Sequence, residues 1–339
     1  MSDGQRVDAN RAVEAMVRGH RLRAWEWLPW FAALGAYFLF PGYLSLIPDY
    51  RALGTQIFIA ILLSLSLDLI MGYAGIITLG HAAFFGAGAY AAGLLAAHGW
   101  GEPLSGLVAG GLVAALLGFA SGAIILRARG LTLLMLTLVT AFMLQEAANK
   151  ATAITGGDDG LQGMTVWPVL GLFPFDMYDR TAYLYCLAVL FLAWCIVRRI
   201  VHSPFGRSLT GIRESEARMH AIGSPVFHRR LAAYTMAAGL AGVAGALLAE
   251  TTQFVALEVL GLGRSGDALI MLIIGGVGRL YGAFIGVPLY KIAQDQFSAI
   301  NVVYWNFWIG LLLVLVALFA RGGILGLAEQ IRQLARRRR

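Results

Sequence analysis

The sequence has little charge, little cysteine and almost no lysine, and each shortage narrows what the protein can be. Charged residues are 13% of its 339 residues, where soluble domains carry about a quarter. Hydrophobic residues make up 59%, and the mean hydropathy is +0.72. The two cysteines, Cys186 and Cys195, lie on one expected helix, about 13 Å apart along its axis and too far for a disulfide. The composition predicts an integral membrane protein.

The sequence also lacks the patterns of an enzyme or a nucleotide-binding protein. Its only lysines, Lys150 and Lys291, do not follow a glycine, so no GxxxxGK[ST] loop is present to cradle phosphates. The GGVG run at 275–278 lacks the third glycine of a dinucleotide fingerprint. Metal-ligand spacing is missing from the histidines of one polar segment, His202, His220 and His228. We expect no catalytic residue, metal or cofactor in this chain, and an intramembrane enzyme would need distant residues to converge.

Apolar stretches long enough to cross a hydrocarbon core of about 30 Å recur along the chain. They predict an all-α polytopic membrane protein with about ten transmembrane segments. The first stretch lacks the cleavage site of a signal peptide, so we expect it to remain as a membrane helix. The eighth and ninth are short and interrupted by glycine, which is typical of half-helices or a re-entrant pair. The expected spans are residues 27–47, 54–72, 77–97, 104–126, 131–148, 182–197, 230–255, 267–277, 281–296 and 304–320.

Basic residues gather on one side of these spans. With the N-terminus inside, 21 of the 26 Lys and Arg residues lie on the cytoplasmic side, so the positive-inside rule predicts that both termini are cytoplasmic. The net charge of +7 then follows from topology and from attraction to anionic membrane lipid, most clearly at Arg336–Arg339, and nucleic-acid binding is not expected. The expected parts are a cytoplasmic segment 1–26, a transmembrane domain 27–320 with an extracytoplasmic loop 149–181 and a cytoplasmic segment 198–229, and a basic cytoplasmic tail 321–339.

A glycine-rich run, GYAGIITLGHAAFFGAGAY, occupies residues 72–90. Small residues at this density favour close helix packing, which is one complete explanation of the run. The alternative is that Tyr73, His81 and Tyr90 line a solute pathway, because an imidazole at membrane depth is costly unless it faces protein or water. Both interpretations stay open at this point.

Four residues before this run, Asp68 lies deep in the second apolar span. A carboxylate there should be protonated, paired or facing a wet cavity, and His81 is one candidate partner. A packing hydrogen bond from a protonated Asp68 is the alternative. Glu250 and Asp267 lie near span ends, where solvation at the membrane interface is the simpler explanation.

One polar segment, SPFGRSLTGIRESEARMHAIGSP at 203–225, interrupts the apolar chain. Ser203 and Pro204 predict a capped helix start, and Gly223 predicts its end before Ser224-Pro225 begins the next helix. Apolar residues at helical spacing predict one short amphipathic helix, with Glu214 and Arg218 as an i,i+4 ion pair. An interfacial helix lying on lipid is possible, but the mixed charge favours a protein partner.

These motifs together resemble the permease subunits of ATP-binding-cassette importers for branched-chain amino acids, specifically the M-type subunit. The resemblance spans about residues 52–325 and rests on the 72–90 run, TGGDDGLQG at 155–163, the 203–223 segment and LIMLIIGGVGRLYGAFIG at 269–286. It implies a non-catalytic permease in the bacterial inner membrane, paired with a second, related permease. It also implies two cytoplasmic ATPases that carry ATP and Mg²⁺, and an extracytoplasmic solute-binding protein.

In such importers the polar segment is the coupling helix, which fits a cleft of an ATPase. The resemblance assigns ATPase coupling to a set of residues in this segment: Arg213, Glu214, Glu216, Ala217, His220, Ala221 and Gly223. It assigns docking of the binding protein to the outer loop, with the motif Thr155, Gly156, Gly157, Asp158, Asp159 and Gly160. Two positions depart from the family pattern. Arg218-Met219 replaces an Ala-Ala pair, and Asp68 replaces an Asn, which leaves room for a cationic or amide-bearing solute.

We therefore expect a permease that imports branched-chain amino acids or related small solutes by alternating access, driven by separate ATPases. Alternatives are the same importer with an amide, urea or cationic solute, and a stand-alone proton-coupled transporter that uses Asp68 and His81 as a relay. An intramembrane enzyme or a scaffold is the remaining alternative.

Overall fold

The computed structural model describes residues 27–39, 50–169, 171, 173, 180–300, 307–311, 314, 323, 324 and 326. Several sequence predictions lie outside these residues. They are the N-terminal segment 1–26, the end of the first span after residue 39, most of the tenth span at 304–320, most of the tail 321–339 and part of the loop 149–181.

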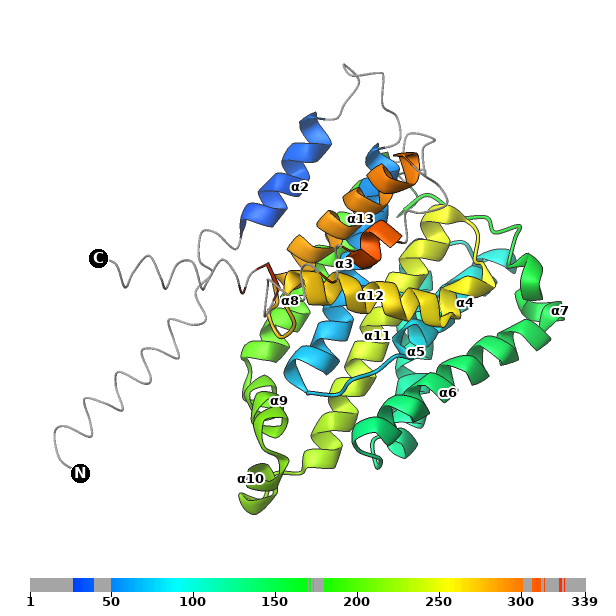
Figure 1. Cartoon of the computed structure of the whole chain (residues 1–339). Helices are drawn as coiled ribbons and strands as arrows, with labels where there is room; N and C mark the ends of the chain where they lie inside the picture. Colours follow the sequence, from blue (N-terminus) through cyan, green and yellow to red (C-terminus); the bar gives the residue numbers. More distant parts are fainter. Residues whose placement is uncertain are drawn as a thin grey trace, which may run out of the picture.

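Helices make up nearly all regular structure in the described part of the chain (Figure 1). No strand is named within these ranges, and the two β-bridges, Leu161 to Val255 and Val169 to Phe173, are isolated. The all-α prediction is confirmed. The longer helices are α2 (Leu28–Leu39), α3 (Tyr50–Asp68), α4 (His81–Ala97), α5 (Pro103–Ile125), α6 (Gly130–Lys150), α8 (Arg180–His202), α9 (Pro204–Glu214), α11 (Val226–Thr252), α12 (Leu262–Gly275) and α13 (Gly282–Ile300).

Five stretches among the described residues are long and apolar enough to cross a membrane, which fits a polytopic membrane protein. They are Arg51–Tyr73, Pro103–Ile125, Gly130–Lys150, Arg180–His202 and Val226–Thr252, and α4 is a shorter apolar helix. The total of ten spans and the cytoplasmic placement of the termini stay predictions. With 14 residues, α12 rises about 21 Å, which is short of the hydrocarbon core, whereas α13 has 19 residues and rises about 28 Å, longer than expected of a half-helix.

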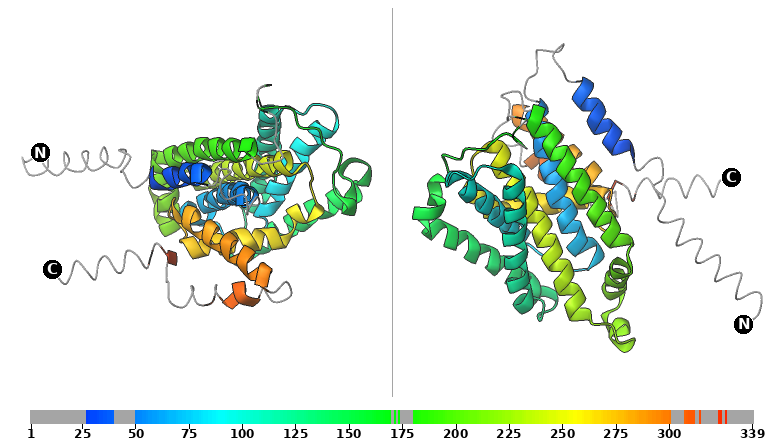
Figure 2. Two further views of the ribbon diagram at one scale, coloured as in Figure 1. Left: turned by 90° about the horizontal axis from the view of Figure 1, so that it is seen from above. Right: turned by 180° about the vertical axis from the view of Figure 1, so that it is seen from behind.

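Helix α11 lies in the middle of the bundle and packs against α3, α4 and α5 (Figures 1 and 2). Glycines permit this close approach. A Cβ atom at Gly245 would overlap the Phe85 carbonyl oxygen, and one at Gly88 would overlap the backbone of Gly242. The packing interpretation of the 72–90 run is therefore supported at Gly88, because the α4 and α11 backbones meet where that glycine stands.

The bundle has two ends, which we name after the short helices they carry. The α10 end holds α10 (Glu216–Ala221), the start of α6 and the start of α11, and the α7 end holds α7 (Thr152–Thr155) (Figure 1). The sequence analysis predicts that the α10 end is cytoplasmic.

The polar segment forms two helices, so the prediction of a single helix is wrong. Helix α9 ends at Glu214, Ser215 adopts an extended conformation, and α10 follows. Ser215 Oγ accepts from the Arg218 N–H at 3.4 Å, because serine is a strong N-cap residue that competes with a continuous helix. The predicted caps at the two outer ends are confirmed. Ser203 Oγ accepts from the Gly206 N–H at 3.3 Å, and Gly223 has a left-handed φ of +77°.

Candidate functional site

Asp68 ends α3 and is 2% exposed. Its Oδ1 accepts from the Gly278 backbone N–H at 2.7 Å, in the turn between α12 and α13, while its Oδ2 is buried with no hydrogen-bond partner among the described residues. A Cβ at Gly72, in the π-helical turn Leu69–Tyr73, would overlap both the Asp68 side chain and the Gly278 backbone. Asp68 therefore joins α3 to the α12–α13 turn, and Gly72 lets that turn approach.

His81 is held by a different partner. It begins α4, is fully buried, and its Nε2 hydrogen-bonds the Ser66 hydroxyl at 2.8 Å. Its Nδ1 is buried without a partner in the described part of the chain. The direct Asp68–His81 pair that the sequence suggested does not form: the bonded atom of Asp68 meets Gly278, and the bonded atom of His81 meets Ser66.

The other two candidate pathway residues lie apart from each other. Tyr73 is half-buried and interacts electrostatically with Asp68 and Arg213, whereas Tyr90 is buried in α4. The Tyr90 hydroxyl has no hydrogen-bond partner among the residues described. A solute pathway along Asp68, Tyr73, His81 and Tyr90 stays a prediction.

Arg213 links the polar segment to the region of the Asp68–Gly278 hydrogen bond. Its Nη1 donates to the Gly72 carbonyl oxygen, and its side-chain stem lies against Gly75, which has a left-handed φ of +70°. Two buried side chains, Leu209 and Ile212, anchor helix α9 to the bundle. A continuous set of contacts therefore runs from α9 through Gly72 and Asp68 to the α12–α13 turn.

Glu216, the first residue of α10, joins three basic side chains. Its carboxylate lies 3.0 Å from Arg129 before α6, 3.4 Å from Arg230 in α11 and 3.7 Å from His220 one turn along α10. The predicted Glu214–Arg218 ion pair does not form, because the break at Ser215 places the two residues on separate helices. Glu216 thus ties α10 to two long helices of the bundle.

The rest of α10 projects from the bundle. None of its residues is buried, and the expected coupling residues Ala217, His220 and Ala221 are exposed, as is Gly223 just after it. Ile222 is 75% exposed, although it is a large apolar residue. The tip of this anchored segment is therefore accessible to another molecule.

The TGGDDG motif forms a compact turn after α7, at the opposite end of the bundle. Thr155 is buried and its hydroxyl donates to the carbonyl oxygens of Ala148 at 2.5 Å and Ala151 at 2.9 Å. The motif's three glycines, Gly156, Gly157 and Gly160, all have positive φ. This backbone presents Asp158 and Asp159 to the surface, where both are exposed.

A cavity of about 250 Å³ lies among α3, α4, α11, α12 and α13, and the sequence analysis did not find it. Its wall is mostly apolar, but Arg264, Asp267 and Lys291 also line it. None of the predicted pathway residues does. The only sequence signal was the charge of these three residues inside or beside apolar spans, and Asp267 was explained as interfacial. Glu250, explained in the same way, is instead 5% exposed and accepts from the Tyr185 hydroxyl at 2.8 Å.

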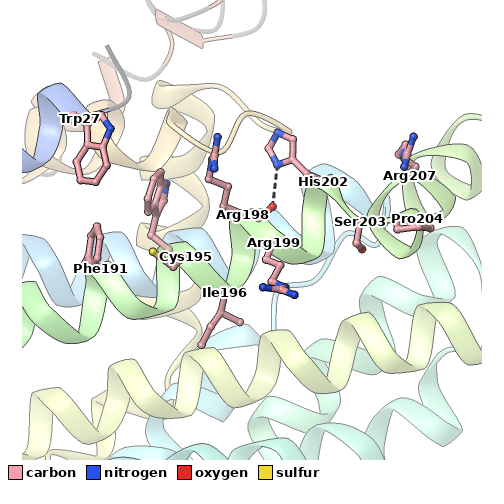
Figure 3. Close-up of a pocket in the computed structure, with 11 residues that line it drawn as sticks. Trp27, Phe191, Cys195, Ile196, Arg198, Arg199, His202, Ser203, Pro204 and Arg207 are labelled. Carbon is pink, nitrogen blue, oxygen red and sulfur yellow. Dashed lines mark hydrogen bonds between the residues drawn. The ribbon is translucent and has the colours of Figure 1, made fainter. Parts of the chain in front are cut away.

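A basic groove of about 830 Å³ lies where α8 meets α9 (Figure 3). Trp27, Phe191 and Trp194 form its aromatic part, and the Arg198 guanidinium lies 5.7 Å from the Trp194 ring centre. Arg199, His202 and Arg207 also line it, and no acidic residue within the described ranges does. As for metals, no three His, Cys, Asp or Glu side chains converge in the part of the chain that the structure describes.

The helical fold with several apolar spans, the glycine-packed core and the anchored polar segment define a membrane transport permease. A family model described as the branched-chain amino acid transport system / permease component matches residues 51–317, and the chain belongs to this family. The resemblance to the M-type permease is confirmed.

Individual relatives agree with this assignment. Two are named High-affinity branched-chain amino acid transport system permease protein LivM, from Salmonella typhimurium strain LT2 and Escherichia coli strain K12. Each is 28% identical over 295 residues, which cover 80% of this chain and 69% of the relative. A probable branched-chain amino acid transport permease LivM from Methanocaldococcus jannaschii is 24% identical over 153 residues, 41% of this chain and 44% of that protein. No solved structure matches the chain.

Proposed function

We propose that this chain is the permease subunit of an ATP-binding-cassette importer for branched-chain amino acids or closely related small solutes. Separate ATPases at the α10 end drive it, and a second, related permease completes the solute path. The bacterial inner membrane is its site of action, with the α10 end in the cytoplasm. The relatives' printed names supply the solute class, and the family supplies the transport role.

The observation that carries the proposal is the linkage of the exposed α10 tip to the membrane helices. Glu216 ties α10 to Arg129 and Arg230, and Arg213 contacts Gly72 beside the Asp68–Gly278 joint. A force applied to α10 by an ATPase would therefore reach α3, α11 and the α12–α13 turn through direct contacts. A freely hinged surface helix could not transmit such a movement.

Two further surfaces fit the remaining partners. The exposed Asp158 and Asp159 on their rigid turn offer a docking point for an extracytoplasmic binding protein. The basic groove at Arg198, Arg199 and Arg207, with its aromatic side chains, suits the headgroups of anionic lipid at the membrane surface (Figure 3).

The test is Glu216→Arg in the complete importer, reconstituted in proteoliposomes with its partner subunits and binding protein. Arginine at 216 would repel Arg129 and Arg230, so we expect solute transported per ATP to fall at least tenfold while the permease still inserts. Asp295→Arg is the matched control, because Asp295 is exposed, lies outside the polar segment and makes no ion pair among the described residues. Its coupling ratio should stay closer to wild type, and unchanged coupling in Glu216→Arg would contradict the proposal.

The stand-alone transporter is distinguished in the same vesicles. A proton gradient without ATP should give no uptake if the proposal holds. Uptake driven by the gradient alone, without ATPase subunits, would favour that alternative.

A further inference from the structure

The α12–α13 hairpin carries three charged side chains on one wall of the 250 Å³ cavity. Arg264 and Asp267 lie in the first half of α12, and Lys291 lies midway along α13. The opposite wall is apolar, with Ile59 and Leu63 from α3 among its members. From the start of α3, Gln56 to Leu63 lie about 9 to 20 Å along the helix axis, and the exposed Gln56 and Thr252 show that the cavity opens to the surface.

The three charges do not neutralise one another. No ion pair within 4 Å joins Asp267 to Arg264 or Lys291 among the described residues, although Lys291 feels the charge of both. Asp267 Oδ1 accepts from the Tyr290 hydroxyl at 2.7 Å, and Lys291 Nζ donates to Gln294 Oε1 at 3.2 Å. These neutral partners hold Asp267 and Lys291 in place without a direct ion pair. Ionisable side chains that line a mostly apolar pocket are costly unless they are paired, so three charges without a direct ion pair point to a polar ligand.

A second cleft borders on the same residues. A neighbouring cleft of about 540 Å³, lined by Gln145 of α6 and Glu258 among others, shares Arg264 and Asp267 with it. A solute moving from the cleft into the cavity would therefore meet charges of both signs before it reached the apolar wall.

We propose that Arg264, Asp267 and Lys291 form a zwitterion-binding subsite for an apolar α-amino acid. Arg264 and Lys291 hold the carboxylate, Asp267 holds the ammonium group, and the apolar wall receives the aliphatic side chain. Arginine suits the first role because its guanidinium pairs with a carboxylate through two parallel hydrogen bonds. At about 250 Å³, the cavity is smaller than the roughly 300–1,000 Å³ that hold drug-sized ligands, which matches a solute of this size. This subsite rests on the proposed import of such amino acids.

The experiment uses the complete importer in proteoliposomes, with radiolabelled L-leucine supplied by saturating binding protein. We expect Arg264→Gln and Asp267→Asn each to lower uptake at least tenfold, while ATP hydrolysis stimulated by the binding protein stays within about twofold of wild type. Vanadate-trapped complexes of these variants should also retain less labelled leucine than wild type does. Arg127→Gln and Asp295→Asn are the matched controls, because both residues are exposed and neither lines the cavity.

The outcomes separate this subsite from the proposed function. Wild-type leucine uptake by both Arg264→Gln and Asp267→Asn would overturn the subsite and leave the permease function intact. Loss in Arg264→Gln alone, with normal uptake in Asp267→Asn, would overturn zwitterion recognition in favour of a carboxylate site. Absence of uptake of any apolar amino acid by the wild-type importer would contradict the proposed function itself. Arg264→Lys and Asp267→Glu keep the charges and should restore part of the uptake, which excludes misfolding as the cause of a loss.

Discussion

At the scale of single residues, the main feature is which hydrogen-bond partner each buried polar side chain has. Asp68 accepts a hydrogen bond from Gly278, and His81 shares one with Ser66. Buried groups that lose such a partner cost about 1–3 kcal/mol each. The Asp68–Gly278 bond therefore holds α3 to the α12–α13 turn, and the Ser66–His81 bond holds α3 to α4. A direct hydrogen bond between Asp68 and His81 is not needed to explain why both are buried.

Asp68 substitutions test this structural role. In Asp68→Asn the side-chain oxygen can still accept from the Gly278 N–H, so we expect a thermal midpoint and ATP-driven uptake close to wild type. In Asp68→Ala that N–H loses its partner, and we expect a destabilisation of about 1–3 kcal/mol together with reduced uptake. Thermal unfolding of the purified complex and uptake in proteoliposomes are the measurements. Abolished uptake in Asp68→Asn at normal stability would show that the charge or a proton on Asp68 matters.

At the scale of elements, the polar segment consists of two short helices that differ in how they contact the bundle. Helix α9 is anchored by buried Leu209 and Ile212, whereas none of the residues of α10 is buried. Ser215 separates them by capping α10, and Gly223 ends the exposed part with a left-handed φ of +77°. The segment therefore has a fixed base and a projecting tip, which is the shape expected of a part that fits a partner's cleft.

A substitution at Gly223 tests the role of the α9–α10 segment without disrupting any side-chain contact. A Cβ at this position would meet no atom within 4 Å, so only the backbone conformation opposes a side chain. We expect Gly223→Val to strain the turn by about 1–2 kcal/mol and to lower solute transported per ATP. Gly223→Asn should be milder, because asparagine tolerates the left-handed region. Equal coupling ratios in the valine, asparagine and wild-type importers would show that this turn has no part in energy transfer.

At the scale of the whole molecule, the two ends of the bundle present different surfaces. The α10 end carries the projecting tip, and the α7 end carries the acidic turn at Asp158 and Asp159 (Figure 1). Between them, α11 packs on α3, α4 and α5, and glycines let it approach α4 and α5 closely. The proposed importer needs separate docking surfaces on opposite sides of the membrane, and these two surfaces lie at opposite ends of one helical core.

Sided labelling tests this arrangement. In a variant whose exposed Cys195 is replaced by serine, we expect Asp159→Cys to react with a membrane-impermeant maleimide in cells whose inner membrane is intact. Ala217→Cys, at the α10 end, should react only after the inner membrane is permeabilised. Labelling of Ala217→Cys from outside would reverse the predicted orientation, and cross-linking of the same variant to a co-purified ATPase would locate that partner.

Sequence reasoning succeeded where a signal is local in the chain. Ser203-Pro204 and Gly223 identified the ends of the polar segment, because capping depends on residues within one helical turn. It failed at Ser215, where one serine competes with an otherwise continuous amphipathic pattern. It also misjudged Glu250, whose burial depends on Tyr185, a residue 65 positions away in another helix.

The amino-acid sequence by itself determined the class of fold, five of the apolar spans, the outer caps of the polar segment and membership in the permease family. These follow from composition, helical periodicity and short motifs, all of which act between near neighbours in the chain. Only the tertiary structure decided that Asp68 bonds Gly278, that Glu216 joins α10 to Arg129 and Arg230, and that Arg264, Asp267 and Lys291 share one cavity. The physical reason is that a buried charge takes whichever partner helix packing brings within about 3–4 Å, and spacing along the chain does not specify that partner.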